Sequence, residues 1–270
     1  MKRRVFVSSL AGGVITAAAH FSAQDAGRKS SPSAAAPEFY IWRQYILRNG
    51  TQPRRLGEYL QNAAIPAMNR LGHRPVGVFE VITGLPTPSV FVLIPCPTLD
   101  SLRMLEDGLD HDEQFQREGA AYIDAPATDP AYIRQEVSLL SAFPRMPRIE
   151  MPAATGAKGP RLFELRIYES PTEKGHRAKV RMFEEMGEID IFRRVGLAPV
   201  FFARTLVGPR MPNLVYLLVH ENMAAREKSW SAFRNDPEWK KVGAAPGYSN
   251  AEIVSNITTI FLQPAPHSQI

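Results

Sequence analysis

Short stretches in which apolar and polar residues alternate recur along the chain and predict β-strands. The clearest is residues 162–168, with phenylalanine, leucine and isoleucine at positions 163, 165 and 167 and more polar residues between them. Since successive side chains of a strand point to opposite faces, this alternation predicts a strand with one apolar face. Elsewhere, apolar residues recur every three or four positions, as from Leu56 to Leu71, and this spacing predicts an amphipathic helix.

The predicted elements follow one order in both halves of the chain. In the first half, we expect strands at 39–46, 76–83, 90–94 and 135–143 and helices at 54–71 and 99–109. In the second half, we expect strands at 162–168, 200–207, 214–219 and 252–262 and helices at 176–195 and 223–234. Pro66 is expected to kink the first helix. Asp236 and Pro237 predict the start of a further short helix, because Asp caps free N–H groups and Pro fits the first helical position.

The two halves also align residue by residue. Residues 71–119 match residues 195–243 at a constant offset of 124 without a gap, so that Gly72 falls on Gly196 and Gly84 on Gly208. A period of this length indicates duplication of a whole domain rather than a solenoid.

The order β-α-β-β-α-β is that of a ferredoxin-like fold, with an antiparallel sheet and both helices on one face. The third strand of each half is apolar at nearly every position, which is typical of strands buried on both sides. The bare face of each sheet therefore needs a cover, and the other copy supplies it. We predict an α+β protein in which two tandem ferredoxin-like βαββαβ units pair as an intrachain α+β barrel.

Composition divides the chain into five segments. Residues 1–26 read as a signal peptide, since Lys2, Arg3 and Arg4 precede an uncharged apolar run too short to span a membrane. The start resembles a twin-arginine signal, with an ordinary secretory signal as the alternative, and we expect export to the periplasm. A flexible linker at 27–37, a first repeat at 38–146, a second linker at 147–160 and a second repeat at 161–264 follow.

Charge and cysteine content exclude several classes of function. The net charge is +5, but without the three basic residues of the signal the chain has 29 basic and 27 acidic residues with no basic stripe. We therefore expect no nucleic-acid partner. Cys96 is the one cysteine, so an intrachain disulfide and a cysteine metal cluster are excluded. The histidines form no ligand set with regular spacing, so no metal site is expected.

Strand phase selects the candidate site residues. If the apolar residues face the helices, the alternate residues face the barrel interior. This set comprises Arg43, Tyr45, Glu80, Arg166, Tyr168, Arg204, Tyr216 and His220. Arginine would hold a carboxylate and tyrosine would donate a hydrogen bond in a ligand pocket. Glu80 falls on Arg204 in the repeat, so these two could pair across the pseudo-twofold axis. The alternative is a structural network of ion pairs that closes the barrel.

His220 ends a strand and falls on Cys96 in the repeat, so it is not duplicated. It could serve as an axial haem ligand or a general base, or it could make only a local hydrogen bond. The sequence contains no dinucleotide-binding, P-loop, nucleophile-elbow or zinc-protease motif. No cofactor is therefore predicted, with haem as the alternative.

Several motifs together resemble the NIPSNAP family of the dimeric α+β barrel superfamily, here tandem-duplicated and of an exported bacterial type. They are Leu162–Tyr168, Leu214–Leu217, Arg226-Glu227 and Asp236-Pro237-Glu238-Trp239. The first half shares the architecture and the Arg43-x-Tyr45 signature, and it departs at 111–115, where the proline is missing and Phe115 replaces tryptophan. The resemblance implies no agreed catalytic residues, whereas the wider superfamily includes cofactor-independent monooxygenases, lactone isomerases and haem-binding or haem-degrading enzymes.

Two functional hypotheses follow. The first is a non-catalytic small-molecule-binding or interaction protein of the cell envelope, with a small apolar or aromatic ligand and a homodimer through the barrel exterior. The alternative is a small-molecule enzyme of the α+β barrel superfamily, either a cofactor-independent monooxygenase or a haem-binding or haem-degrading type.

Overall fold

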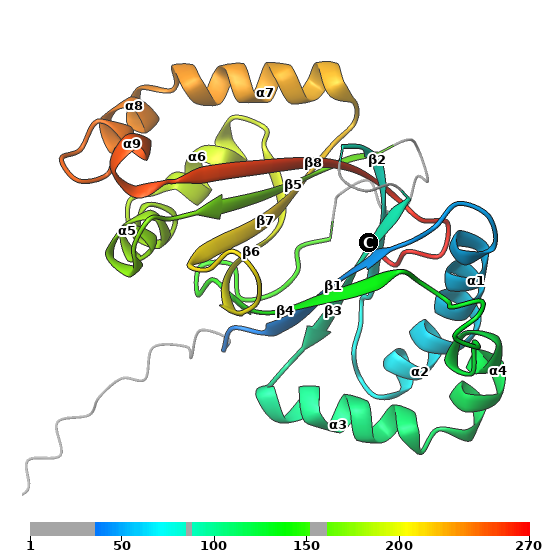
Figure 1. Ribbon diagram of the computed structural model, residues 1–270. Helices are drawn as coiled ribbons and strands as arrows, with labels where there is room; N and C mark the ends of the chain where they lie inside the picture. Colours follow the sequence, from blue (N-terminus) through cyan, green and yellow to red (C-terminus); the bar gives the residue numbers. More distant parts are fainter. Residues whose placement is uncertain (1–35, 85–87, 152–160) are drawn as a thin grey trace, which may run out of the picture. The chain divides into compact units, whose positions relative to one another are not determined.

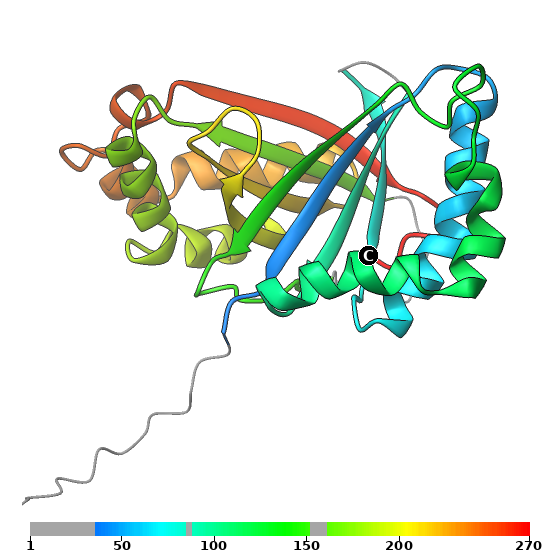
Figure 2. The same cartoon turned by 60° about the horizontal axis from the view of Figure 1, so that its bottom comes forward.

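Eight antiparallel strands close into a barrel in the part of the chain that the computed structural model describes, residues 36–84, 88–151 and 161–270 (Figure 1). The predicted signal peptide and most of both predicted linkers lie outside these residues. Helices lie outside the barrel, those of the first repeat on one side and those of the second on the other (Figure 2). The predicted α+β class is confirmed.

Both repeats contain the predicted order of elements. The first consists of β1 (Phe39–Ile46), α1 (Thr51–Tyr59), the π-helical turn η1 (Leu60–Ala64), α2 (Ile65–Arg70), β2 (Gly77–Thr83), β3 (Ser89–Cys96), α3 (Leu99–Asp110), α4 (Glu113–Ile123) and β4 (Arg134–Ala142). The second consists of β5 (Leu162–Glu169), α5 (Glu173–Glu184), α6 (Glu188–Arg194), β6 (Ala198–Val207), β7 (Asn213–His220), α7 (Met223–Asn235), α8 (Pro237–Gly243), α9 (Asn250–Ile253) and β8 (Asn256–Pro264).

The barrel closes by pairing between the repeats. Within each repeat the strand order is β4-β1-β3-β2 or β8-β5-β7-β6. The last strand of each repeat then pairs with the second strand of the other, with Phe79 opposite Pro264 and Ser141 opposite Arg204. Each described strand therefore has a partner on both sides, and the predicted intrachain barrel is confirmed.

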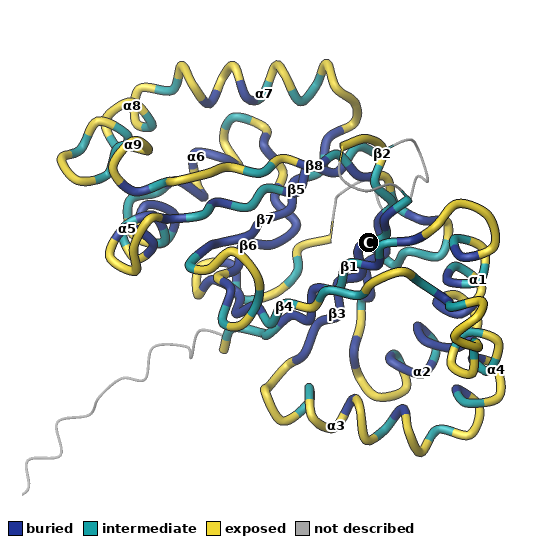
Figure 3. Tube along the Cα trace, in the orientation of Figure 1, coloured by how far each residue is buried: buried dark blue, intermediate teal, exposed yellow. Residues whose placement is uncertain are grey.

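Large side chains fill the barrel interior. Trp42 stacks on Phe91 with ring centroids 5.1 Å apart, and Phe79 meets Phe163 of the other repeat at 4.9 Å. The cavity bounded by Trp42 and Ile260 at one mouth holds only about 50 Å³, room for one or two waters. The interior is therefore a packed core, and burial is concentrated on the strands and on the helix faces that cover them (Figure 3).

Three local features differ from the predictions. The first helix contains the wide η1 turn just before Pro66, because proline cannot donate a hydrogen bond there. The helix expected at 176–195 is broken at Gly187, whose φ of 84° lies in the left-handed region. The last strand begins at Asn256 rather than 252, because a capping box starts α9 instead.

The C-terminal segment, residues 265–270, continues from β8 past the first residues of β2, antiparallel to that strand. The amides of Ala265 and Gln269 donate to the carbonyls of Val78 and Val76, at 2.9 and 3.0 Å. Ile270 is buried and joins the barrel core. This path brings His267 next to α1, where the cavity described below lies.

Candidate functional site

The predicted orientation of the candidate residues is wrong. Phe163 and Leu165 belong to the barrel core, whereas Tyr168 and Tyr216 pack with Phe183 beneath the helices. The remaining candidates share this outer phase, since each alternates with a core residue. The outward set is Arg43, Tyr45, Glu80, Arg166, Tyr168, Arg204, Tyr216 and His220.

The candidates face the helices because charged and polar side chains need hydrogen-bond or ion-pair partners when they are buried. A closed interior between two sheets offers a charged group neither water nor donors, and burial of an unpaired charge is strongly unfavourable. The helices of the second repeat provide such partners, among them Arg226 and Trp230 on α7. The charged and tyrosine candidates therefore face the helix layer, whereas Phe163, Leu165 and Leu217 face inward.

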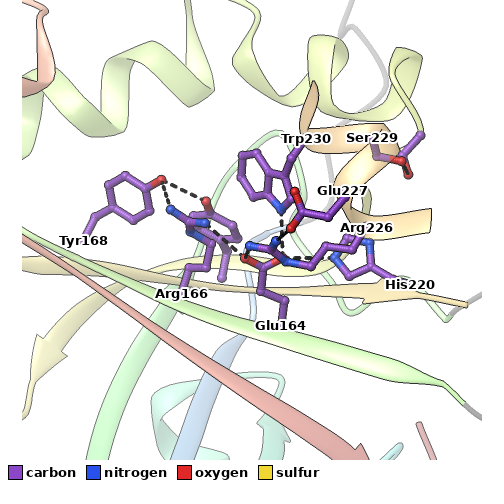
Figure 4. A network of polar contacts seen from close by, with 10 residues as sticks. Glu164, Arg166, Tyr168, His220, Arg226, Glu227, Ser229 and Trp230 are labelled. Atoms are coloured by element: carbon purple, nitrogen blue, oxygen red, sulfur yellow. Dashed lines mark hydrogen bonds and ion pairs between the residues drawn. The ribbon is translucent and has the colours of Figure 1, made fainter. Parts of the chain in front are cut away.

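Glu164 on β5 is the centre of a buried polar network in the second repeat (Figure 4). Arg226 donates from Nε to Oε2 and from Nη2 to Oε1, both at 2.8 Å. Trp230 Nε1 donates to Oε2 at 2.8 Å, and His220 Nε2 lies 3.1 Å from the same oxygen. Arg166 Nη1 donates to Oε1 at 3.0 Å. Five hydrogen-bonding contacts thus occupy both oxygens of the Glu164 carboxylate.

These contacts decide the charge of Glu164. Burial alone would raise the pKa of the carboxyl, but the hydrogen bonds from His220, Arg226 and Trp230 outweigh it, as does the charge of Arg166. The pKa of Glu164 falls from 4.5 to about 2. The carboxylate is therefore ionised throughout the physiological range.

The network continues toward α5 and α6. Arg166 Nη2 donates to the Tyr168 hydroxyl at 3.0 Å, and the Tyr216 hydroxyl donates to the same oxygen at 3.2 Å. The Arg166 guanidinium also lies over the Trp230 ring, 4.6 Å from its centroid. A second buried pair joins Lys179 to Glu188 at 3.1 Å, and burial raises the pKa of that carboxyl.

This network has the character of a structural element. Its carboxylate is saturated, and the two cavities described below are lined by other residues. His220 is buried and its Nε2 lies 3.1 Å from Glu164 Oε2, so it makes the local hydrogen bond that was the alternative to a catalytic or ligand role. The geometry favours the structural alternative for Arg166, Tyr168, Tyr216 and His220.

The first repeat does not keep the network. Ile41 stands where the second repeat has Glu164, and Leu102 stands where it has Arg226. Arg43 retains the position of Arg166 but makes no hydrogen bond or ion pair within the described residues, and its Nε is buried without a partner. The helix layer of the first repeat is therefore free to differ in function.

A cavity of about 220 Å³ lies in that layer, between α1–η1 and the outer face of β2 and β3. Most of its thirteen lining residues are apolar: Leu47, Pro53, Leu56, Gly57, Leu60, Val78, Val81, Pro88, Val90 and Ala265, with Ser89, Glu80 and His267 as the polar members. An apolar cavity with few polar groups is the usual form of a small-molecule site.

His267 is one of the polar residues that line this cavity, and its ring has an unpaired nitrogen. Its Nε2 is buried and has no hydrogen-bond partner. Burial lowers the pKa of the imidazole, and the nearby charge of Glu80 only partly opposes this. The ring is therefore neutral at pH 7. A Cβ added at Gly57 would lie 3.9 Å from its Cε1, so this glycine leaves open the space beside the ring.

Glu80 stands at the border of this cavity and a larger groove. Its Oε2 accepts a hydrogen bond from Gln263 Nε2 at 2.9 Å. Glu80 and Ala265 line both the cavity and a groove of about 790 Å³ that also involves Phe261. Arg204 lines a different groove beside Arg177, and within the described residues the predicted pairing of Glu80 with Arg204 does not occur.

His267 and Gly57 were not among the predicted site residues. His267 lies after the last predicted strand, and only the backward path of residues 265–270 brings it to α1. Gly57 did carry a signal, because glycine inside a helical pattern is unfavourable and often has a packing or functional reason.

The fold and the helix-layer sites define a duplicated α+β barrel protein. Residues 163–269 match the NIPSNAP family model, so the second repeat is a NIPSNAP domain and the predicted resemblance is confirmed there. No curated protein matches the sequence.

Two solved structures share the fold over most of this chain. A putative monooxygenase from Lactobacillus acidophilus NCFM has a TM-score of 0.55 at 8% identity, over 84% of this chain and 94% of that one. An anthrone oxidase-like protein has a TM-score of 0.51 at 10% identity, over 86% and 93%. An uncharacterised NIPSNAP-like domain protein from Burkholderia xenovorans is 23% identical over 41% and 90%, with a TM-score of 0.36.

Two further observations concern the described residues only. Within 36–84, 88–151 and 161–270, no three His, Cys, Asp or Glu side chains gather in a way that could hold a metal ion. Over the same ranges, no helix combines the length and apolar character needed to cross a bilayer.

Proposed function

We propose that this protein binds a compact, largely apolar small molecule in the helix-layer cavity of its first repeat. The observation that carries the proposal is the 220 Å³ largely apolar cavity, which His267 helps to line, together with the buried Nε2 of this residue, which has no hydrogen-bond partner. Buried polar atoms are normally satisfied, and a ligand would supply the missing partner.

The divergence of the two repeats supports this assignment. The second repeat fills its helix layer with the saturated Glu164 network, whereas the first leaves a cavity there. Glycine at position 57 of a helix costs about 1 kcal/mol relative to alanine, and its bare backbone keeps the cavity open. Duplication gives one copy a structural role and leaves the other to bind.

A fluorescence titration tests the proposal with 2-naphthalenemethanol as the probe. We expect saturable binding to the native protein and at least a tenfold loss in Gly57→Leu, whose added side chain extends into the cavity. The matched control is Gln61→Leu, which adds the same side chain at an exposed position one turn further on. Equal binding by native protein and Gly57→Leu would place the probe elsewhere and reject this site.

An enzymatic role at the same cavity is the second candidate, because a neutral imidazole beside a bound molecule can accept a proton from it. The fold of the putative monooxygenase supports this only as an analogy. Oxygen uptake and mass spectrometry of the probe after incubation separate the two functions. An oxidised product would favour the enzyme, and recovery of the unchanged probe would favour the binding protein.

We also propose that the protein is exported to the periplasm, as the basic start and apolar run of residues 1–26 indicate. The molecule would then meet its ligand in the cell envelope. N-terminal sequencing of the protein recovered from the periplasmic fraction tests this proposal. Recovery of an uncleaved chain from the cytoplasm would contradict it.

A further inference from the structure

We propose that the first-repeat cavity selects molecules whose polar group is an uncharged hydroxyl, and that it discriminates against carboxylates and ammonium ions. This inference rests on the proposed function, because it names the class of ligand for the same cavity. Three features of the wall carry it: the charge at the rim, the hydrogen-bonding capacity of His267 and the apolar remainder.

The charge at the rim excludes anions. Among the thirteen residues that line the cavity, Glu80 is the acid and no lysine or arginine is present. A bound carboxylate would leave water for a site that has a negative charge at its border and no counter-charge. Like charges close together in a partly buried site repel strongly.

The apolar wall disfavours an ammonium ion as well. Leu47, Leu56 and Val78 cannot replace its hydration, and three N–H donors would need acceptors. Glu80 is the one charged acceptor in the wall, and one of its oxygens already accepts from Gln263 at 2.9 Å. A cation would therefore exchange its full hydration for the few acceptors of a largely apolar wall, at a cost in desolvation.

A hydroxyl group can form a hydrogen bond with either His267 or Glu80. It donates one hydrogen bond and accepts others, so it satisfies His267 Nε2 in either tautomer of the neutral ring. Because Glu80 and Ala265 also line the larger groove, the polar end of a ligand belongs at this border. The hydrocarbon part then occupies the apolar space beside Gly57.

Four probes that share one skeleton test the selection: 2-naphthalenemethanol, 2-naphthylmethylamine, 2-naphthoate and 2-methylnaphthalene. We expect the alcohol to bind the native protein at least tenfold more tightly than the carboxylate and at least threefold more tightly than the amine or the hydrocarbon. A carboxylate or amine that bound as tightly as the alcohol would overturn the inference.

Two substitutions assign the selection to its residues. In Glu80→Gln, which keeps the shape and removes the charge, the ratio of alcohol to carboxylate affinity should fall at least threefold. In His267→Phe, the alcohol should lose its advantage over 2-methylnaphthalene, and binding of the hydrocarbon reports that the cavity is intact. Unchanged ratios in both variants would show that these residues do not select the ligand.

The outcomes separate the two proposals. If none of the four probes binds saturably, or if all bind Gly57→Leu as they bind the native protein, the proposed function fails. If all four bind the cavity with similar affinity, the function stands and the hydroxyl selection is wrong.

Discussion

Replacing Glu164 with glutamine should destabilise the protein in a way that depends on pH. The carboxylate accepts from Arg226, Trp230 and Arg166 in a fully buried site, and glutamine cannot serve three donors or neutralise two guanidinium groups. Breaking a buried ion pair by removing one partner typically costs 3–5 kcal/mol. We expect Glu164→Gln to lower the free energy of unfolding by about 3 kcal/mol at pH 7.

The pKa of Glu164 gives a second value for its contribution to the free energy of unfolding. A fall from 4.5 to about 2 favours the folded state by about 3 kcal/mol, at about 1.4 kcal/mol for each pKa unit. Since the folded pKa is the lower one, this contribution is complete above pH 4.5 and is lost as the pH falls toward 2. Burial raises the pKa of Glu188 and contributes with the opposite sign, but it is common to both proteins and cancels in their difference.

Urea unfolding followed by circular dichroism at pH 7 and pH 3.5 measures the effect. The difference between native protein and Glu164→Gln should shrink by about 1 kcal/mol or more at the lower pH. Glu227→Gln is the matched control, because Glu227 also contacts Arg226 but is exposed, and it should change stability by less than about 0.5 kcal/mol. An equal effect of both substitutions, or a difference independent of pH, would refute the reasoning.

Three further predictions follow from the fold. Ile270→Ala should lower stability by about 2–4 kcal/mol, seen as a fall in Tm, because its side chain is buried in the barrel core; an unchanged Tm would show that this end does not seal the barrel. Residues 36–146 and 161–270 expressed separately should dimerise or aggregate, because each exposes an apolar sheet face; size-exclusion chromatography should not show a folded monomer. Replacing Arg3 and Arg4 with lysine should abolish periplasmic accumulation if the signal is of the twin-arginine type; fractionation with normal export would assign an ordinary secretory signal.

The order of elements and the closure of the barrel were predictable because both rest on local patterns that occur twice. The constant offset through Gly72 and Gly84 established the repeat, and a repeat with one bare sheet face requires a cover. Element boundaries were less predictable where capping decides them, as at Glu252, which was expected to begin a strand but forms a capping box with Ser249 in a short helix.

The orientation of the site residues was not predictable from alternation. Alternation separates two faces of a strand such as β5 but does not say which one is inside, and in this barrel both faces are buried. The deciding fact is that α7 supplies donors to Glu164, and those donors lie 62 and 66 residues further along the chain. The cavity likewise depends on His267, whose position is set by tertiary hydrogen bonds rather than by its own neighbours.

The pairing of each repeat's last strand with the second strand of the other repeat also fixes when the barrel can close during synthesis. Phe79 pairs with Pro264, so β2 waits for 185 further residues before its partner exists. At about 5–20 residues per second, the ribosome needs roughly 10–40 s to make that stretch. Throughout this interval the first repeat carries an open strand edge, the kind of surface that pairs with other chains. A protein whose first half is complete early in translation therefore still depends on its final residues, and premature termination anywhere before β8 leaves a nascent chain prone to aggregation.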